Sequence, residues 1–147
     1  MLVNQTAIAD LKELFITVNT PQIDADSTNL RNNLDRFLND QAITGYRAGR
    51  KKIIPYYEII SIHTENKAVV CETIDGLYQL KKRLYEIREL LPYRLFVQIS
   101  SSEILNFSCI QEFALTRNGI YQVILKNGKT TYTSRRYMQV INKEYLP

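Results

Sequence analysis

The sequence is poor in the residues that bind transition metals, with one histidine and two cysteines among 147 residues. His63 has no second histidine with which to share a metal ion, and Cys71 and Cys109 lack the close spacing of a zinc site. Two cysteines without paired spacing form no disulfide framework, which favours a reducing cytoplasm. We therefore expect a cytoplasmic protein without a metal or another cofactor.

The residues of an active site are equally scarce. The five glycines are scattered singly along the chain, so no glycine-rich loop is present to bind a phosphate. The three consecutive serines 100–102 lack the glycine-flanked setting of a hydrolase nucleophile and have no histidine near them in the sequence. No pair of carboxylates stands out as an acid–base couple. We expect that the chain is not an enzyme.

Long apolar runs are absent as well. No segment approaches the roughly 18 apolar residues of a membrane-spanning helix. The N-terminus carries Asp10 and Glu13 and has no basic start, so it does not read as a secretory signal peptide. The sequence therefore predicts neither a membrane span nor export by such a signal.

Positive charge is present but unevenly distributed. Residues 1–45 hold three basic and six acidic residues, a net charge of −3, whereas residues 46–147 hold sixteen basic and nine acidic residues, a net charge of +7. A positive field of this kind attracts a polyanionic partner, although it carries no information about the fold. We expect such a partner to bind the C-terminal two-thirds of the chain.

Short alternations of apolar and polar residues, separated by turn residues, predict a mainly β domain with short helices over residues 46–147. The class is α+β, with antiparallel strands in more than one sheet. We expect helices over residues 81–91 and 134–145, and strands over residues 42–47, 52–54, 58–64, 68–73, 77–80, 95–99, 110–116, 120–125 and 129–133.

Two details of this domain are specific enough to be tested. In the strand over residues 58–64, Ile60 and Ile62 are expected on one face and Ile59 on the other, because side chains alternate along a strand. Further on, Ile104 and Leu105 are apolar, and Asn106 is a residue that favours turns.

Residues 1–45 are expected to form an N-terminal extension built from one strand and one helix. The strand covers residues 14–18, and the helix runs from about Thr28 to Asn39 with Asp26 or Ser27 as its N-cap. The helix carries one apolar stripe, which needs a surface to cover. We favour packing of this stripe on the chain's own domain over packing on a second copy. The stripe consists of Leu30, Leu34, Phe37 and Leu38.

The stretch from Lys126 to Met138 combines a tight turn with a basic helix start. Asn127-Gly128 predicts a type I′ hairpin, because both residues tolerate a positive φ. Ser134 is expected to cap the last helix through its hydroxyl. Arg135 and Arg136 then occupy a helix N-terminus, where cations are disfavoured but anions bind well. This arrangement predicts an anion site, with a solvated basic turn as the alternative.

Five segments in this order resemble the LytTR-type DNA-binding domain of bacterial transcription regulators. The resemblance extends from about Ile53 to Leu146. None of the segments is specific alone, but their order is. The matching segments are Tyr57–Ile62, Thr73–Tyr78 with the helix residues Leu84 and Ile87, Phe96–Asn106, Leu125–Gly128 and Thr133–Arg136.

The resemblance implies a mostly antiparallel β fold that reads successive major grooves of DNA through loops rather than through a recognition helix. Carried over by position, it implies three contact points in this chain. The loop after the opening strand contributes Lys67. The turn of the Phe96–Asn106 segment contributes Ser101, with Gln98 and Ser100 beside it. The final turn contributes Arg136, with Arg135 beside it, and Lys129 is expected near the phosphates.

The chain departs from the family pattern at the middle contact. The family usually has basic residues where this chain has Gln98 and Ser101, and histidine where it has Ser100. Serine and glutamine still donate hydrogen bonds to phosphates and base edges. They release fewer counterions, so we expect lower affinity and a different sequence preference.

The sequence thus predicts a sequence-specific, DNA-binding transcriptional regulator of the short, stand-alone type without a receiver domain. The resemblance implies a co-encoded membrane protein that restrains the regulator, and the other expected partners are double-stranded DNA in tandem promoter repeats, a second copy of the chain on that DNA, and RNA polymerase. Two alternatives remain open at this point. One is a protein-interaction module or anti-regulator that has lost strong DNA binding, and the other is an RNA-binding domain.

Overall fold

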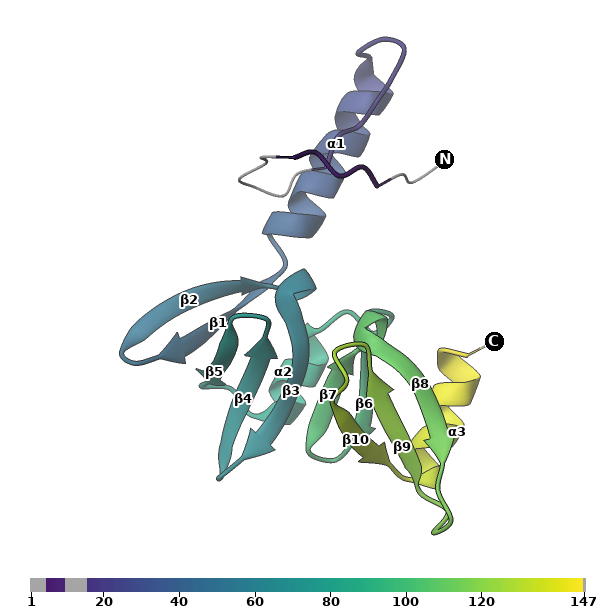
Figure 1. The fold of residues 1–147 in the computed structure, drawn as a ribbon. Coiled ribbons are helices and arrows are strands. Elements are labelled where there is room, and N and C mark those ends of the chain that lie inside the picture. Colours follow the sequence, from purple (N-terminus) through teal and green to yellow (C-terminus); the bar gives the residue numbers. More distant parts are fainter. Residues whose placement is uncertain (1–4, 10–15, 147) are drawn as a thin grey trace. The chain divides into compact units, whose positions relative to one another are not determined.

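The structure is a computed structural model that describes residues 5–9 and 16–146. The chain divides into two compact units, Met1–Phe37 and Leu38–Pro147 (Figure 1). The division into an extension of residues 1–45 and a domain of residues 46–147 stays a prediction.

Among the residues described in the N-terminal part, one helix is present, α1 (Ala25–Asn39). It begins three residues earlier than predicted, and its cap is Asp24 rather than Asp26 or Ser27. The Asp24 carboxylate accepts a hydrogen bond of 2.8 Å from the Ser27 amide, and the Ser27 hydroxyl accepts one of 3.0 Å from the Asp24 amide. The bonds from Ser27 lower the pKa of Asp24.

The predicted N-terminal strand is wrong for the residues that are described. Residues 16–20 adopt no regular structure, and residues 14–15 of that prediction lie outside the described part of the chain. On α1, Leu30 and Leu34 are half-buried, whereas Phe37 is 48 % exposed. The stripe is thus only partly covered.

The second unit is built from two antiparallel sheets, as the sequence predicts. The larger sheet has the order β2-β1-β5-β4-β3-β7-β6, and the smaller one the order β10-β9-β8. The strands are β1 (Ala42–Arg47), β2 (Arg50–Pro55), β3 (Ile59–Glu65), β4 (Ala68–Thr73), β5 (Gly76–Leu80), β6 (Phe96–Ser100), β7 (Glu103–Asn106), β8 (Ile110–Leu115), β9 (Tyr121–Leu125) and β10 (Thr130–Thr133).

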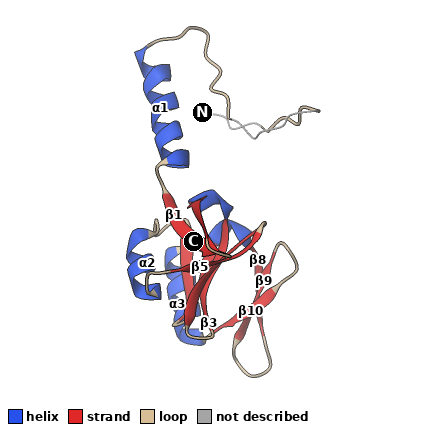
Figure 2. Ribbon diagram, turned by 90° about the vertical axis from the view of Figure 1, so that its left-hand side faces the viewer, coloured by secondary structure: helices blue, strands red, loops and turns tan. Residues whose placement is uncertain are grey.

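Two helices accompany these sheets, α2 (Leu84–Leu90) and α3 (Arg135–Glu144), and two 3₁₀ turns occupy Tyr56–Glu58 and Phe107–Cys109. Both helices lie on the same side of the strands (Figure 2). The helix predicted over residues 81–91 is shorter than expected. Arg83 is extended, and its amide donates to the Glu86 carboxylate at 2.8 Å, so the helix begins at Leu84.

Two hydrophobic clusters hold the unit together. The β6–β7 hairpin contributes to both, because Phe96 and Ile104 face one cluster, whereas Val97 and Leu105 face the other. The first cluster lies between the larger sheet and α2, with Ile54, Ile59, Ile62, Cys71, Tyr78, Leu80, Leu84, Ile87 and Leu91. The second joins β6–β7 to the smaller sheet and α3, with Ile99, Val123, Leu125, Met138 and Ile141.

A bulge in β3 overturns the expected orientation of its isoleucines. The register of β3 against β4 shifts between Ile59 and Ser61. As a result Ile59 and Ile62 share the first cluster, whereas Ile60 packs against the second. Strict alternation predicted Ile60 and Ile62 on one face, because it allowed for no extra residue in the strand.

The residues 103–106 form a strand, β7, that the sequence reading left unassigned. It is buried between β3 and β6, where Ile104 and Leu105 are fully covered. Asn106 ends this strand: its side-chain Nδ2 donates to the Ile59 carbonyl at 2.9 Å, and its side-chain oxygen accepts from the Ser108 backbone amide at 3.1 Å. The turn preference of Asn106 is thus confirmed at the last residue of the missed strand.

Gly45 lets β1 approach the first cluster closely. A Cβ atom at this position would lie 2.6 Å from Ile54 and 2.7 Å from Tyr78, which is too close for any larger residue without movement of its neighbours. The hairpin β1–β2 thereby extends the larger sheet beyond β5.

The Asn127-Gly128 hairpin is confirmed, but its turn type is not I′. Gly128 has a φ of 85°, whereas Asn127 is not among the residues with positive φ. The Gly128 amide donates to the Leu125 carbonyl at 2.9 Å, and the Leu125 amide donates to the Lys129 carbonyl at 2.9 Å. These bonds define a three-residue loop with glycine in the left-handed position.

Candidate nucleic-acid interface

Three connections between strands or helices lie at one end of the second unit. They are the β3–β4 turn, the β6–β7 turn and the junction between β10 and α3 (Figure 1). The Thr64 amide at the end of β3 donates to the Ser102 carbonyl in the β6–β7 turn at 2.9 Å. The Thr133 hydroxyl at the end of β10 donates to the Ile99 carbonyl of β6 at 2.6 Å, and this bond is buried. The three connections are therefore fastened to one another, and we call them the loop edge.

The β3–β4 turn presents Lys67 at its tip. Asn66 and Lys67 have φ values of 50° and 65°, the pattern of a type I′ turn. Such positions favour glycine or asparagine, and a left-handed lysine costs about 1 kcal/mol or more. The Lys67 side chain is exposed and forms no hydrogen bond or ion pair with any described residue.

The β6–β7 turn is shaped by its own side chains. The Gln98 side-chain Nε2 donates to the Ser100 carbonyl at 3.0 Å, and the Ser100 hydroxyl accepts from the Ser102 backbone amide at 3.2 Å. Ser101, at the tip, is exposed and has no polar partner among the described residues. Ser101 is therefore the member of this turn that is free to contact a partner, whereas Gln98 and Ser100 hold the turn in shape.

The start of α3 is capped as predicted. Ser134 is extended, and its hydroxyl accepts from the Tyr137 amide at 3.4 Å. Arg136 is exposed and unpaired within the described part of the chain. Arg135 differs, because its Nε donates to the Gly119 carbonyl in the β8–β9 turn at 3.0 Å. The two neighbouring arginines therefore have different surroundings.

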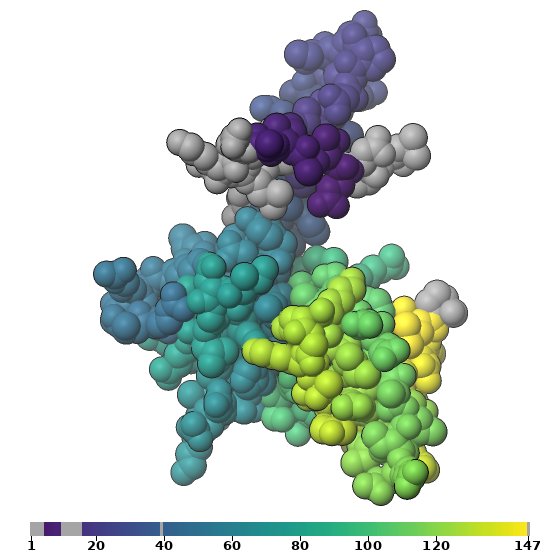
Figure 3. Space-filling view, viewed as in Figure 1, coloured from purple at the N-terminus to yellow at the C-terminus, as the bar shows by residue number. Residues whose placement is uncertain are grey.

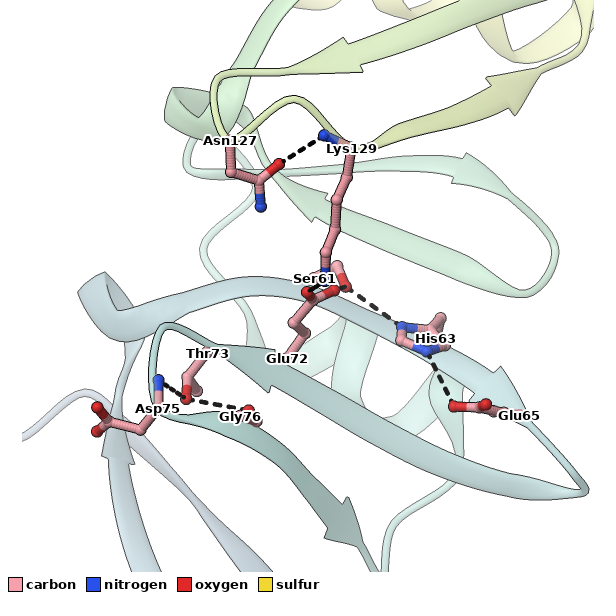
Figure 4. Close-up of polar contacts among 9 residues, drawn as sticks. All are labelled: Ser61, His63, Glu65, Glu72, Thr73, Asp75, Gly76, Asn127 and Lys129. Carbon is pink, nitrogen blue, oxygen red and sulfur yellow. Dashed lines mark hydrogen bonds and ion pairs between the residues drawn. The ribbon is translucent and has the colours of Figure 1, made fainter.

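The structure separates Lys129 from the other predicted contacts. Lys129 precedes β10, whereas Ser134 follows it, so the whole strand lies between Lys129 and the loop edge. The Lys129 ammonium reaches across to β4 and forms an ion pair with Glu72 (Figure 4). This ion pair joins the two sheets, and Glu72 also accepts from the buried Ser61 hydroxyl at 3.3 Å.

The single histidine lies beside polar side chains of its own strand, and the two cysteines are partly or fully buried. His63 Nδ1 lies 3.2 Å from the Ser61 hydroxyl, and Nε2 lies 3.6 Å from the Glu65 carboxylate (Figure 4). Burial raises the pKa of the Cys71 thiol to about 12 and raises that of Cys109. Residues 5–9 and 16–146 contain no group of three histidine, cysteine or acidic side chains that could hold a metal ion.

One further connection, the β8–β9 turn with Arg117 and Asn118, lies at the same end as the loop edge (Figure 1). The sequence predicts strands over residues 110–116 and 120–125, which implies a turn between them, but no functional role was expected for it. The signal that could have indicated it is Arg117, a basic residue directly before an Asn-Gly pair, which predicts a cation exposed at a turn. Its position beside the start of α3 depends on the pairing of β8, β9 and β10.

The loops of this edge are held together by hydrogen bonds and carry exposed lysine, arginine and serine side chains. Such a surface is typical of proteins that bind an extended anionic partner. The LytTr DNA-binding domain family matches residues 49–145, and the chain belongs to this family. The chain is 32 % identical to an uncharacterised HTH-type transcriptional regulator of Staphylococcus aureus strain bovine RF122 / ET3-1, and 31 % identical to one of strain NCTC 8325 / PS 47. Each comparison covers 97 % of both chains.

A solved structure supports the fold. The LytTr DNA-binding domain of a response regulator from Bacillus cereus superposes with a TM-score of 0.66 and covers 70 % of this chain and 94 % of that one, at 18 % identity. The described helices α1, α2 and α3 are separated by strands, so no two of them follow one another across a short turn as a helix-turn-helix requires. None of the described helices is long and apolar enough to cross a membrane.

Proposed function

We propose that this DNA-binding regulator of transcription reads duplex DNA through the loop edge, with Lys67, Ser101 and Arg136 as its three principal contacts. The observation that carries the proposal is the fastening of three separate connections by the Thr64–Ser102 and Thr133–Ile99 hydrogen bonds. Each connection ends in an exposed polar side chain that is unpaired within the described residues. Loops held in this way present their side chains to a partner with little loss of conformational freedom.

The three contacts have different chemistry. Arg136 carries a planar fork of donors and suits the O6 and N7 atoms of guanine in the major groove. It stands at the first turn of α3, where amides and helix dipole favour a nearby phosphate and orient the DNA backbone. Lys67 supplies a point charge for a phosphate, and Ser101 donates to a phosphate or a base edge. Base reading at Arg136 supplies specificity, and the other contacts set the register.

The backbone of Lys67 supports a role in binding. A lysine in a left-handed turn position is retained at a cost to stability, although glycine or asparagine would adopt that conformation more easily. A cation at the tip of a type I′ turn projects away from the sheet toward solvent. This placement is what a phosphate contact requires.

Binding is expected to depend steeply on salt. The loop edge and the neighbouring β8–β9 turn carry four exposed basic residues: Lys67, Arg117, Arg135 and Arg136. If Lys67, Arg117 and Arg136 together displace the counterions of about two to three phosphates, the log–log slope of affinity against salt is about −2 to −3, taking about −0.9 per phosphate. Fluorescence anisotropy with a duplex selected from a random library, titrated between 50 and 300 mM salt, measures the slope.

Two results of that titration would contradict the proposal. A slope near zero would favour the protein-interaction module or anti-regulator, since such a protein gains nothing from counterion release. Equal competition by single-stranded RNA and by duplex DNA would favour an RNA-binding domain.

The remaining partners follow from the family and from the charge distribution. We propose a cytoplasmic regulator in which residues 1–45 form an extension that serves assembly or regulation, and residues 46–147 bind DNA. The net charge of −3 on residues 1–45 would repel a phosphate backbone. RNA polymerase and a co-encoded membrane protein that restrains the regulator are its further proposed partners.

We expect the chain to be a monomer when free and a dimer on tandem sites, where the DNA supplies the effective concentration. Sedimentation velocity of the full chain alone, with a single-site duplex and with a tandem-site duplex measures this directly. A dimer at micromolar concentration without DNA would show instead that the chain carries its own dimerisation surface.

A further inference from the structure

The β8–β9 turn is a rigid projection beside the loop edge. Its three-residue loop is closed by the Thr116 amide, which donates to the Ile120 carbonyl at 2.9 Å, and by the Gly119 amide, which donates to the Thr116 carbonyl at 3.1 Å. The Thr116 hydroxyl also donates to the Ile120 carbonyl at 2.7 Å. Figure 3 shows the β3–β4 and β8–β9 turns as two projections at this end, with the surface set back between them.

Arg135 fastens this turn to the start of α3. Besides the 3.0 Å bond from Nε to the Gly119 carbonyl, its guanidinium lies directly over the glycine. A Cβ atom on Gly119 would meet the Arg135 Cζ at 2.9 Å and Nη2 at a still shorter distance. Gly119 also has a φ of 76°, a conformation that favours glycine. Glycine is therefore required here twice, once for the backbone conformation and once to leave room for the guanidinium. The contact explains why an arginine occupies a helix N-terminus that disfavours cations.

Arg117 stands at the tip of the turn that Arg135 holds. Its side chain is exposed and forms no hydrogen bond, ion pair or cation–π contact within the described residues. Residues 116–120 contain no carboxylate, so nothing in the turn compensates its charge. β8 is also the outer strand of the smaller sheet. The β8–β9 turn therefore lies beyond the start of α3, on the side away from the β3–β4 turn (Figure 1).

We propose that the β8–β9 turn is a fourth DNA contact, in which Arg117 binds a backbone phosphate flanking the segment read by Arg136. Arg135 is a positioning residue that holds this turn against α3. The inference rests on the proposed function, and it extends the footprint of the protein on one side only. A phosphate rather than a base is the partner, because Arg117 lies at the outer end of the row and a guanidinium binds phosphate oxygens in a bidentate manner.

The first test uses the full chain and a duplex selected by it from a random library. Arg117→Ala is expected to weaken binding about 3- to 10-fold, alike for the selected duplex and for a scrambled duplex, and to make the salt slope shallower by about 0.9. In ethylation interference, the variant is expected to lose the signal at one or two phosphates that flank the binding site on one side. Arg94→Ala is the matched control, because Arg94 is exposed at the opposite end of β6.

The second test separates positioning from contact. Arg135→Ala is expected to weaken binding in the native chain but to have little further effect when Arg117 is already alanine, because both changes remove the same contact. Gly119→Ala is expected to behave like Arg135→Ala, since it displaces the guanidinium. Circular dichroism of each variant checks that the fold is retained.

Three results are decisive. If Arg117→Ala leaves affinity, salt slope and interference pattern unchanged while the native chain binds with a steep slope, this inference fails and the proposed function stands. If Arg135→Ala weakens binding equally in both backgrounds, Arg135 contacts DNA itself and its positioning role is wrong. If the native chain shows no salt dependence, the proposed function fails first.

Discussion

Replacing Arg136 by alanine is expected to weaken binding of the selected duplex by about 5- to 150-fold, which corresponds to about 1–3 kcal/mol. The reason is the loss of a bidentate contact to a base edge, for which the exposed and unpaired guanidinium at the start of α3 is suited. Anisotropy titrations at fixed salt, against the selected duplex and a set in which each base pair is changed in turn, measure both affinity and preference.

The pattern of this loss distinguishes a base contact from a phosphate contact. Arg136→Ala should relax the preference at one base pair, whereas Arg117→Ala should weaken all duplexes alike. Arg94→Ala should change neither quantity, since Arg94 lies away from the loop edge. Unchanged affinity and unchanged preference in Arg136→Ala would show that this arginine does not read a base.

Truncation of Ile141 to alanine is expected to lower the free energy of unfolding by about 2–5 kcal/mol. Ile141 is 0 % exposed and lies in the second cluster, where α3 meets β6 and the smaller sheet. Removing its side chain leaves a cavity in a site that is closed on every side, so little of the lost packing can be recovered. Urea unfolding followed by far-ultraviolet circular dichroism measures the change.

The matched control for this prediction is Val140→Ala on the same helix. Val140 is 50 % exposed, so its truncation should change stability by no more than about 0.5 kcal/mol. Equal effects of the two substitutions would show that α3 is not anchored through Ile141. The start of α3 carries Arg136, so this anchoring also determines how well the proposed base contact is oriented.

Several features of this protein follow from short segments, and these the sequence could predict. Ser134 caps α3, Met138 and Ile141 face inward, and the Asn-Gly pairs form hairpin turns. Each depends on bonds or spacings within about four residues. The order of the five family segments likewise predicted the class of protein, because this order can be recognised without knowing how the segments pack.

Other predictions failed because distant residues decide them. The bulge in β3 is set by the pairing of Ile59 and Ser61 with β4, which a strand pattern in isolation does not contain. β7 was missed because a strand that is buried on both faces between β3 and β6 shows no alternation of apolar and polar residues. The N-terminal strand failed where it can be checked, since residues 16–20 adopt no regular structure.

By itself, the sequence determined the family, the mainly antiparallel β class and the basic character of the residues near the last helix. Only the tertiary structure decided which of the basic residues lie at the same end of the second unit. Lys129 lies beyond the far end of β10 in an ion pair with Glu72, Arg135 is bound to Gly119, and the β8–β9 turn lies at the same end of the unit as the loop edge. The physical reason is that strand pairing over long sequence separations, fastened by bonds such as those from Thr64 to Ser102 and from Thr133 to Ile99, determines which loops share an edge.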